Sequence, residues 1–438
     1  MNKNTEAIVT EILQTVKKKG ATDAEVVYSK GKGLSISVRN GDVDTIENSE
    51  DSSLILTVYN GKAKGSASSA LLDDKSIALT IDKAWEIAKL TQEDEFSGLA
   101  EKELLANPAD FKDLSIYHPT QVTPQNMIDL GLEAEAAALE TNGIIVDETN
   151  ISIGEGVSVY GTSKGFLGTK KGTNSSMSVV AIAQKDGAME RDYWWDAVRK
   201  FDDMMPADAI GRKAAKRTIA RIGAKKVKSC KVPVLFDSTV AQGLVGHMLS
   251  AISGSSLYQD ASFLKEDLGK QIFPKWFNIF EDPFIKGGFA SRNYDSNGVT
   301  TKQRHIIGSG ILQGFLLSVY SAKRLGLTTT GNSGGSHNLL INSTDKSFTD
   351  AIKELNKGLY VTSVMGQGVN TINGDYSRGA SGFWVENGEI QFPVSEITIA
   401  SNLKDMYKNL VFVAKDIDTR SKIQTGSWMI EEMTIAGD

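Results

Sequence analysis

The chain has 438 residues, of which 40% are hydrophobic and 23% are charged, and its formal net charge is −6. This composition is typical of a folded globular protein long enough for two or three domains, and it excludes a disordered or fibrous chain. The negative charge argues against nucleic-acid binding, which needs a basic face. The single cysteine, Cys230, excludes an intramolecular disulfide framework and any multi-cysteine metal site within one chain.

The N-terminal stretch MNKNTEAIVTEILQTVKKKG shows no sign of export. It lacks the apolar core of a signal peptide, and its apolar residues recur at helical spacing instead. No run in the chain approaches the ~18–20 apolar residues of a membrane span. We therefore expect a cytoplasmic protein with no membrane partner.

Short alternating segments follow the first helix, and the pattern then repeats. AEVVYSKG, GLSISVRNG, VDTIENSE and SSLILTVYNGKAKGSASS are separated by turns such as Asn40-Gly41, which predicts an antiparallel sheet. Helices are expected near 75–91 and 124–141, on either side of an acidic connection at 94–123. VSVYGTSKG, GFLGTKKG and SSMSVVAIAQKDG then predict a second set of strands. Two helix-plus-meander units indicate a two-lobed, duplicated N-terminal domain.

A basic helix near 206–222 joins the two halves of the chain. Acidic residues at its start and basic residues at its end complement the helix dipole. We interpret the basic run as a solvated linker helix rather than as an anion or nucleic-acid patch. The sequence thus predicts an N-terminal α+β domain at 1–205, a basic linker helix at 206–230 and a C-terminal domain at 231–438.

The C-terminal domain is expected to mix antiparallel strands with helices. VPVLF predicts a buried strand, and RHIIGSGILQGFLLS and SGFWVENGEIQFPVSEITIA predict hairpins, the second turning at Asn387-Gly388. Ser347 and Asp350 predict a capped helix start, with Gly358 as the C-cap. Strands in meanders with helices between them make the fold class α+β.

Two glycine-rich stretches are candidates for ligand contact, because their exposed N–H groups can cradle an anion or an extended peptide. GLTTTGNSGGSHN, which ends at Asn338, lacks the Gly-Lys-Ser/Thr ending of a P-loop and the elbow of a serine hydrolase. In VMGQGVNTINGDYSRGASGFWVENGE, six glycines surround Asp375, Ser377 and Arg378. For this second stretch we weigh a substrate-facing loop against a structural loop that covers the sheet.

The histidines give an incomplete metal motif. In AQGLVGHMLSA, His247 occupies a helix where a zinc peptidase would need two imidazoles and a glutamate general base. His118 and His305 are expected to be surface or packing residues. A zinc site built from His247 and His337 would need a third ligand, which the sequence does not name.

Four stretches within about 258–406 resemble the TldD/PmbA family, the so-called modulators of DNA gyrase, and specifically its PmbA (TldE) branch. They are YQDASFLKEDLGKQIFP, SNGVTTKQRHIIGSGIL, SVYSAKRLGLTTTGNSGGSHN and MGQGVNTINGDYSRGASGFWVENGEIQFPVSEITIASNLKDM. The TldD branch carries an H-E-x-x-x-H helix and a C-terminal cysteine as zinc ligands, and it is a metallopeptidase. Set against that motif, Gln242 falls on the first histidine, Gly243 on the glutamate and His247 on the second histidine. The cysteine falls near Thr425 or Ser427.

The resemblance implies a chain with no catalytic or metal-binding residue of its own. Zinc is expected in a TldD-type partner chain, and the two chains together would degrade small or unfolded peptides. We expect peptide contacts at the walls of a channel in the dimer interface, from His337, Gly366, Gly368, Asp375, Ser377 and Arg378. One alternative is a homodimeric peptidase whose divergent site combines His247, His337 and carboxylates such as Asp375. Another is an interaction protein that acts on gyrase directly.

Overall fold

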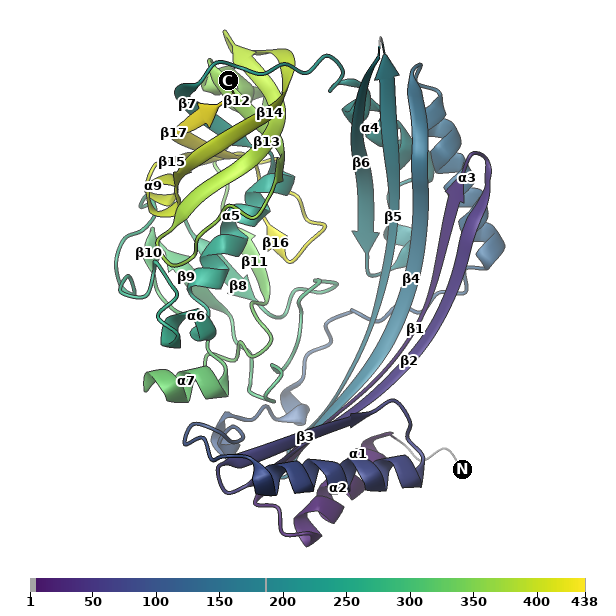
Figure 1. Cartoon of the computed structure of the whole chain (residues 1–438), viewed down its shortest axis with the longest axis vertical. Coiled ribbons are helices and arrows are strands. Elements are labelled where there is room, and N and C mark those ends of the chain that lie inside the picture. The colour runs from purple at the N-terminus through teal and green to yellow at the C-terminus, as the bar shows by residue number, and fades with distance from the viewer. Residues whose placement is uncertain (1–4, 186, 438) are drawn as a thin grey trace.

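One six-stranded antiparallel sheet dominates the N-terminal half of the chain (Figure 1). The structure is a computed structural model that describes residues 5–185 and 187–437. The first unit consists of α1 (Thr5–Lys18), β1 (Asp23–Arg39), β2 (Asp42–Asn60), β3 (Ala63–Ser69) and α2 (Asp74–Leu90). The second consists of α3 (Pro124–Leu139), β4 (Ile144–Thr162), β5 (Leu167–Lys185), β6 (Ala188–Val198) and α4 (Ala207–Ile219). The expected pair of helix-plus-meander units is confirmed, and antiparallel pairing of β1 with β4 joins them in the order β3-β2-β1-β4-β5-β6.

The strands are much longer than the sequence pattern predicts. AEVVYSKG and GLSISVRNG, expected as two strands, form the single 17-residue β1, and β2 has 19 residues. The prediction of short strands was wrong because glycine does not end a strand here. Gly31 and Gly33 pair with Gly156 and Gly154 of β4, so the ladder continues through them. The turn at Asn40-Gly41 is confirmed, with φ values of 56° and 75°.

Helices cover one face of this sheet and create two separate cores. Helices α1 and α2 pack over one end of the strands, and α3 and α4 pack over the other end. In α4, Ile210, Ala214 and Ala215 are each 0% exposed. The helix expected to be a solvated linker is therefore an integral part of the second core, because its apolar face packs against β5, β6 and α3.

The opposite face of the sheet is turned toward the C-terminal domain (Figure 1). Arg199, which follows β6, donates to the carbonyl oxygen of Phe289 at 2.7 Å. Arg420 donates to the carbonyl oxygen of Trp195 at 2.5 Å, and its guanidinium lies 4.1 Å from the ring centroid of Trp194. These contacts tie the second unit of the sheet to the C-terminal domain.

The C-terminal domain contains two sheets. The larger has the order β14-β13-β12-β7-β17-β15, and a further pairing of β14 with β17 closes it on itself. Its strands are β7 (Cys230–Phe236), β12 (Gly358–Met365), β13 (Asp375–Glu386), β14 (Glu389–Asn402), β15 (Leu410–Val413) and β17 (Trp428–Ala436). The smaller sheet, in the order β10-β9-β8-β11-β16, has β8 (Ile279–Asp282), β9 (Arg304–Gly308), β10 (Ile311–Leu312), β11 (Asn338–Ile341) and β16 (Ile423–Gln424). Both expected hairpins are present, as β9–β10 and β13–β14.

Five helices accompany these sheets in the described residues: α5 (Ser238–Ala251), α6 (Gly254–Tyr258), α7 (Val319–Leu325), α8 (Phe348–Leu355) and α9 (Leu403–Lys408). In the N-terminal half, short 3-10 helices lie at Lys102–Leu104, Pro108–Asp110 and Phe201–Asp203. Ser347 and Asp350 form the expected capping box at the start of α8. The expected C-cap at Gly358 was wrong, because Asn356 takes a positive φ of 50° after the helix and Gly358 already begins β12.

The fold class is α+β, as the sequence predicts, because the helices lie beside largely antiparallel sheets rather than alternating with parallel strands. None of the helices within residues 5–185 and 187–437 combines the length and the apolar character that a membrane crossing requires.

Candidate functional site

Helix α5 carries the incomplete zinc motif, and local sequence explains why it forms. Asp237 caps its first turn by accepting the Thr239 N–H at 3.0 Å. Its apolar side is fully packed, with Leu244, Val245 and Met248 at no more than 1% exposure. The remaining face is largely bare, since a Cβ added at either Gly243 or Gly246 would meet nothing within 4 Å.

His247 lies on this helix and is half-buried. Its ring lies edge-on to the ring of Tyr376 in β13, with the centroids 6.0 Å apart. Burial lowers the pKa of His247, and the positive charge of Arg378 lowers it further. The imidazole is therefore neutral at neutral pH, which is the form that binds metals, but a single imidazole makes only one of the ligands zinc needs.

Gln242 falls on the first histidine position of the family motif, and its side chain is fully engaged. The amide Nε2 donates to Asp418 Oδ2 at 3.2 Å, and Oε1 accepts from Ser421 Oγ at 2.8 Å. Asp418 is held in turn by Arg420, with distances of 2.9 Å and 3.0 Å. The fold thus brings α5 beside the segment that precedes the expected cysteine position. The polar side chains between α5 and this segment bond to one another.

The two residues nearest the expected cysteine position are buried and bonded. Thr425 is 0% exposed, and its Oγ1 accepts from Trp428 Nε1 at 2.7 Å. Ser427 is also 0% exposed, and its Oγ donates to Asp416 Oδ2 at 2.7 Å. Neither residue offers a thiolate, and both hydroxyls already serve the packing of the C-terminal strands.

These residues do not fit a zinc ion. One imidazole remains, the general-base position is a glycine, and the other positions carry neutral side chains that are already hydrogen-bonded. Across residues 5–185 and 187–437, no group of three or more His, Cys, Asp or Glu side chains is arranged to hold a metal. His247, His337 and Asp375 therefore do not form such a group within one chain.

A groove of 680 Å³ runs along α5, where Gly246 and Ser250 line it. Its other walls come from α6, the start of α7 and the tip of the loop before β11. Serine and glycine residues make up most of this lining, and we call it the serine–glycine groove after Ser253, Ser256, Ser318, Ser333, Gly334 and Gly335. Such a lining suits the main chain of an extended peptide, because hydroxyl and backbone groups can bind it without regard to its side chains.

The glycine-rich loop at 326–338 forms part of this groove and is anchored by one buried carboxylate. Glu281 in β8 is 1% exposed and pairs with Arg304 Nε at 2.8 Å. It also accepts from Asn332 Nδ2 and from the His337 N–H, both at 2.8 Å. A buried carboxylate is stable only with such partners, so the loop conformation is fixed by Glu281.

His337 lies beneath the loop rather than in the groove. It is 1% exposed, and its Nε2 lies 3.0 Å from the carbonyl oxygen of Gly331, so Nε2 carries the proton and donates. Nδ1 is buried without a hydrogen-bond partner in the described residues, and burial lowers the pKa of His337 to about 4. The expectation of direct peptide contact does not fit this burial, which leaves His337 a role in shaping the loop.

The second glycine-rich stretch connects β12 to β13. Gly366 has a φ of +84° and open space around it, whereas a Cβ added at Gly368 would lie 1.8 Å from the carbonyl oxygen of Ser377. The Ser377 N–H donates to the Gly368 carbonyl oxygen at 2.6 Å. Gly368 is therefore required by the close approach of the two chain segments, and Gly366 by its backbone conformation.

Polar side chains hold the same stretch in place. Asp375 accepts from Asn373 Nδ2 at 2.7 Å and from Asn402 Nδ2 at 3.2 Å. Arg378 Nε donates to the Met365 carbonyl oxygen at 3.1 Å. The structure thus gives these side chains a structural task, and the charge of Arg378 also acts on His247.

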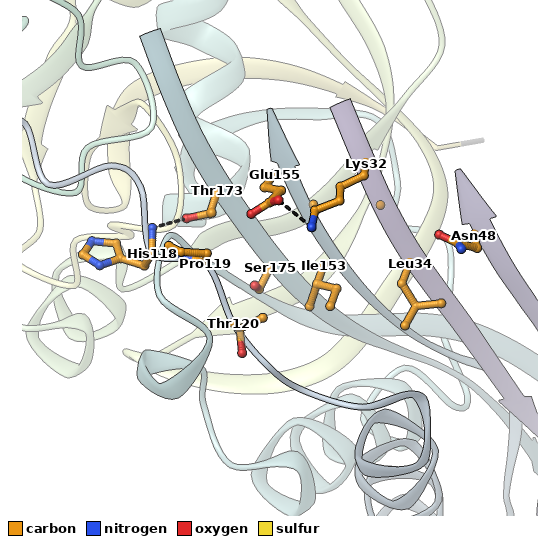
Figure 2. A pocket seen from close by; sticks show the side chains of 12 residues that line it. Lys32, Leu34, Asn48, His118, Pro119, Thr120, Ile153, Glu155, Thr173 and Ser175 are labelled. Atoms are coloured by element: carbon orange, nitrogen blue, oxygen red, sulfur yellow. Dashed lines mark hydrogen bonds and ion pairs between the residues drawn. The ribbon is translucent and has the colours of Figure 1, made fainter. Parts of the chain in front are cut away.

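A separate hollow of 170 Å³ lies on the helix-covered face of the N-terminal sheet (Figure 2). Lys32 and Glu155 form an ion pair across it at 2.7 Å, and the His118 N–H donates to Thr173 Oγ1 at 2.9 Å. The ring Nε2 of His118 lies 2.9 Å from the Ser115 carbonyl oxygen. His118 thus bonds within its own connecting segment, which is the packing role expected of it.

Reasoning from sequence identified α5 and both glycine-rich stretches but missed the residues that organise them. Glu281 and Arg304 hold the first loop, and Arg292 and Lys422 reach its tip. The sequence signal for Glu281 was a carboxylate within the strand IFED, and no pattern in the sequence predicted the residues that bond to it.

The fold and this site define a metallopeptidase-family protein whose zinc motif is incomplete. Family profiles match the PmbA/TldA metallopeptidase domain 1 at residues 24–88, the central domain at 117–222 and the C-terminal domain at 229–437. The chain belongs to the PmbA/TldD family, in its PmbA (TldE) branch.

Named relatives support this assignment over almost the whole chain. Metalloprotease PmbA of Escherichia coli O157:H7 is 48% identical over 416 residues, which are 94% of this chain and 92% of that protein. The Metalloprotease PmbA homolog of Haemophilus influenzae is 43% identical, over 96% of this chain and 93% of that protein.

Solved structures agree on the fold. A Bacteroides thetaiotaomicron protein named a candidate modulator of DNA gyrase superposes with a TM-score of 0.95 at 26% identity and covers 100% of both chains. TldE from Thermococcus kodakarensis superposes with a TM-score of 0.86 at 21% identity, over 98% of this chain and 100% of that chain.

Proposed function

We propose that this chain is the non-catalytic subunit of a TldD-like zinc metallopeptidase complex that degrades small or unfolded peptides. The observation that carries the proposal is the state of the motif on α5. His247 is the one ligand-type residue, Gln242 is committed to Asp418 and Ser421, and Gly243 has no side chain to act as a base. Zinc and the general base would then belong to a TldD-type partner chain, most simply in the cytoplasm.

In this role the serine–glycine groove holds part of the peptide main chain. Support comes from its volume of 680 Å³, its hydroxyl-rich walls and its position along the bare face of α5. Gly366, Gly368, Asp375, Ser377 and Arg378 would contribute by shaping the β12–β13 loop at the subunit interface. His337 would act through the loop before β11, since its own ring is buried.

A second candidate is a peptidase that acts without a partner, and the name Metalloprotease PmbA of the E. coli relative favours it. A homodimer would then have to complete a metal site across its interface. Direct action on gyrase, which the Bacteroides protein's name suggests, has no further support in the features of this chain.

The test combines metal analysis with peptidase assays of the purified chain, alone and mixed with a TldD-type chain. We expect no stoichiometric zinc, no activity alone, and activity in the mixture. His247→Ala should leave the activity of the mixture nearly intact, whereas Arg378→Ala or a bulky residue at Gly366 should reduce it. Zinc near one per chain, or chelator-sensitive activity of the isolated chain, would instead establish the second candidate.

A further inference from the structure

Two basic side chains approach the tip of the glycine-rich loop from different parts of the chain. A Cβ added at Gly334 would lie 2.6 Å from Ser296 Oγ and 3.2 Å from Arg292 Nη1, and one added at Gly335 would lie 4.0 Å from Lys422 Nζ. Both glycines have left-handed backbone, with φ values of +89° and +98°. The loop is therefore free of side chains at the point where the two cations meet it.

Neither cation has a carboxylate paired to it within residues 5–185 and 187–437. In the described parts of the chain, Arg292 and Lys422 form no ion pair, and Arg292 Nε is buried without a hydrogen-bond partner. The carboxylates that act on Arg292 are Asp295 and Glu281, and both have other partners. Glu281 is held by Arg304 and the loop, while Asp295 accepts three backbone N–H groups, those of Asn297, Val299 and Ser333.

The surroundings disfavour the charged form of Lys422 itself and of Lys170 nearby. Burial lowers the pKa of Lys422, the charge of Arg292 acts in the same direction, and the charge of Glu281 opposes both. Burial also lowers the pKa of Lys170 in β5 to about 8, with Arg292 and Arg199 adding to the effect. An anion bound between these groups would relieve the repulsion, so the site favours a negative ligand.

Lys422 lines a ligand-sized space, and Arg292, which is not itself a lining residue, approaches that space at Gly334. Lys422, Gly334, Gly335 and Ser336 all line the serine–glycine groove. Ser336 is 2% exposed, and its Oγ has no hydrogen-bond partner in the described residues. Buried polar groups are almost always bonded in native proteins, so a groove-lining hydroxyl left without a partner indicates that a ligand completes its bonding.

We propose that Arg292 and Lys422, together with Ser336 and the bare backbone of Gly334 and Gly335, form an anion site in the wall of the serine–glycine groove that takes a carboxylate of the bound peptide. The proposal rests on the proposed function, which supplies a peptide as the ligand. Arginine and lysine both bind carboxylates through charge-assisted hydrogen bonds. The carboxylate comes either from the C-terminus of the peptide or from an acidic side chain, and both present the same group.

The test is calorimetric titration of the full-length chain with three N-acetylated pentapeptides. The first is pentaalanine with a free C-terminus, the second is its C-terminal amide, and the third is the amide with a central glutamate. We expect the free acid, the glutamate peptide or both to bind about tenfold more tightly than the alanine amide, with the difference shrinking at high salt. Which of the two charged peptides binds more tightly identifies the source of the carboxylate.

Lys422→Met should abolish the preference for charged peptides while the alanine amide binds as before, and Lys422→Arg should retain it. Lys275→Met, at an exposed lysine outside the groove, is the matched control and should change nothing. Equal binding of all three peptides by the unmodified chain would overturn the anion site but leave the proposed function standing. Absence of binding by every peptide would overturn the anion site and the peptide-binding role of the serine–glycine groove, while the activity of the mixture separately decides the subunit role.

Discussion

Acidification should destabilise the C-terminal domain through His337. The ring is 1% exposed, donates from Nε2 to the Gly331 carbonyl oxygen at 3.0 Å, and leaves Nδ1 without a partner. Protonation would place a second N–H at Nδ1, where nothing in the described residues accepts it. The folded-state pKa of about 4 therefore lies below the ordinary value of ~6.5 that the unfolded chain would show.

The sign and size of the effect follow from this difference. Between pH ~6.5 and pH ~4 the unfolded chain binds more protons than the folded chain, so stability falls as pH falls. A gap of ~2.5 pKa units corresponds to about 3 kcal/mol by the time both forms are protonated. For a domain of roughly 200 residues, this loss corresponds to about 7 °C in melting temperature.

The assay compares thermal unfolding of the unmodified chain and His337→Gln between pH 7 and pH 4. Glutamine can keep the hydrogen bond to Gly331 but does not titrate, so the unmodified chain should lose about 7 °C more than the variant over this range. The chain has four histidines, and in NMR spectra of histidine-labelled protein the signal absent from His337→Gln identifies His337. If that signal titrates near pH 6.5, or if both proteins lose stability in parallel, the reasoning about His337 is refuted.

Two further substitutions test the packing around the site. Gly368→Ala should lower the free energy of unfolding by about 1–3 kcal/mol, because its Cβ would lie 1.8 Å from the Ser377 carbonyl oxygen. In thermal unfolding, this loss of stability should exceed that of Gly366→Ala, where only the left-handed φ is strained. Equal losses for the two variants would contradict the close approach at Gly368. Arg420→Ala should cost about 3 kcal/mol, because it leaves the buried Asp418 without its positively charged partner. It should also alter tryptophan fluorescence, because the guanidinium no longer covers Trp194 and Trp195. Unchanged fluorescence would show that Arg420 does not join the sheet to the C-terminal domain.

Local features of the fold were predictable from sequence, because they depend on residues close together in the chain. The helix at 75–91 appears as α2, and the hairpin at Asn387-Gly388 has the positive φ values that the dipeptide favours. Strand length was not predictable in this way. Gly31 does not end β1, because it pairs with Gly156 of β4. The sequence around Gly31 does not specify that partner, which becomes known only when the position of β4 is known.

The same division holds for the candidate site. The incomplete motif on α5 was evident from Gln242, Gly243 and His247, since their spacing along one helix is local. The contacts that these side chains make were not evident from sequence. Gln242 bonds to residues near the C-terminus, and His337 is buried by strands from other parts of the chain. Arg292 and Lys422 approach the same loop only in the folded chain, and no sequence pattern around either residue predicts this proximity.

We expect the pairing of β1 with β4 to limit the folding of the N-terminal half. Within each unit, β-strands pair with their neighbours in sequence, but each core also takes residues from the other unit. Ile36 and Val38 of β1 lie in the core of α3 and α4, and Val159 of β4 lies in the core of α1 and α2. Residues facing each other across this pairing, such as Ser29 and Ser158, are 129 positions apart. Closing so long a loop is slow compared with forming hairpins. We therefore expect the pairing of β1 with β4 to be a late step of folding, and both cores to be complete only after it.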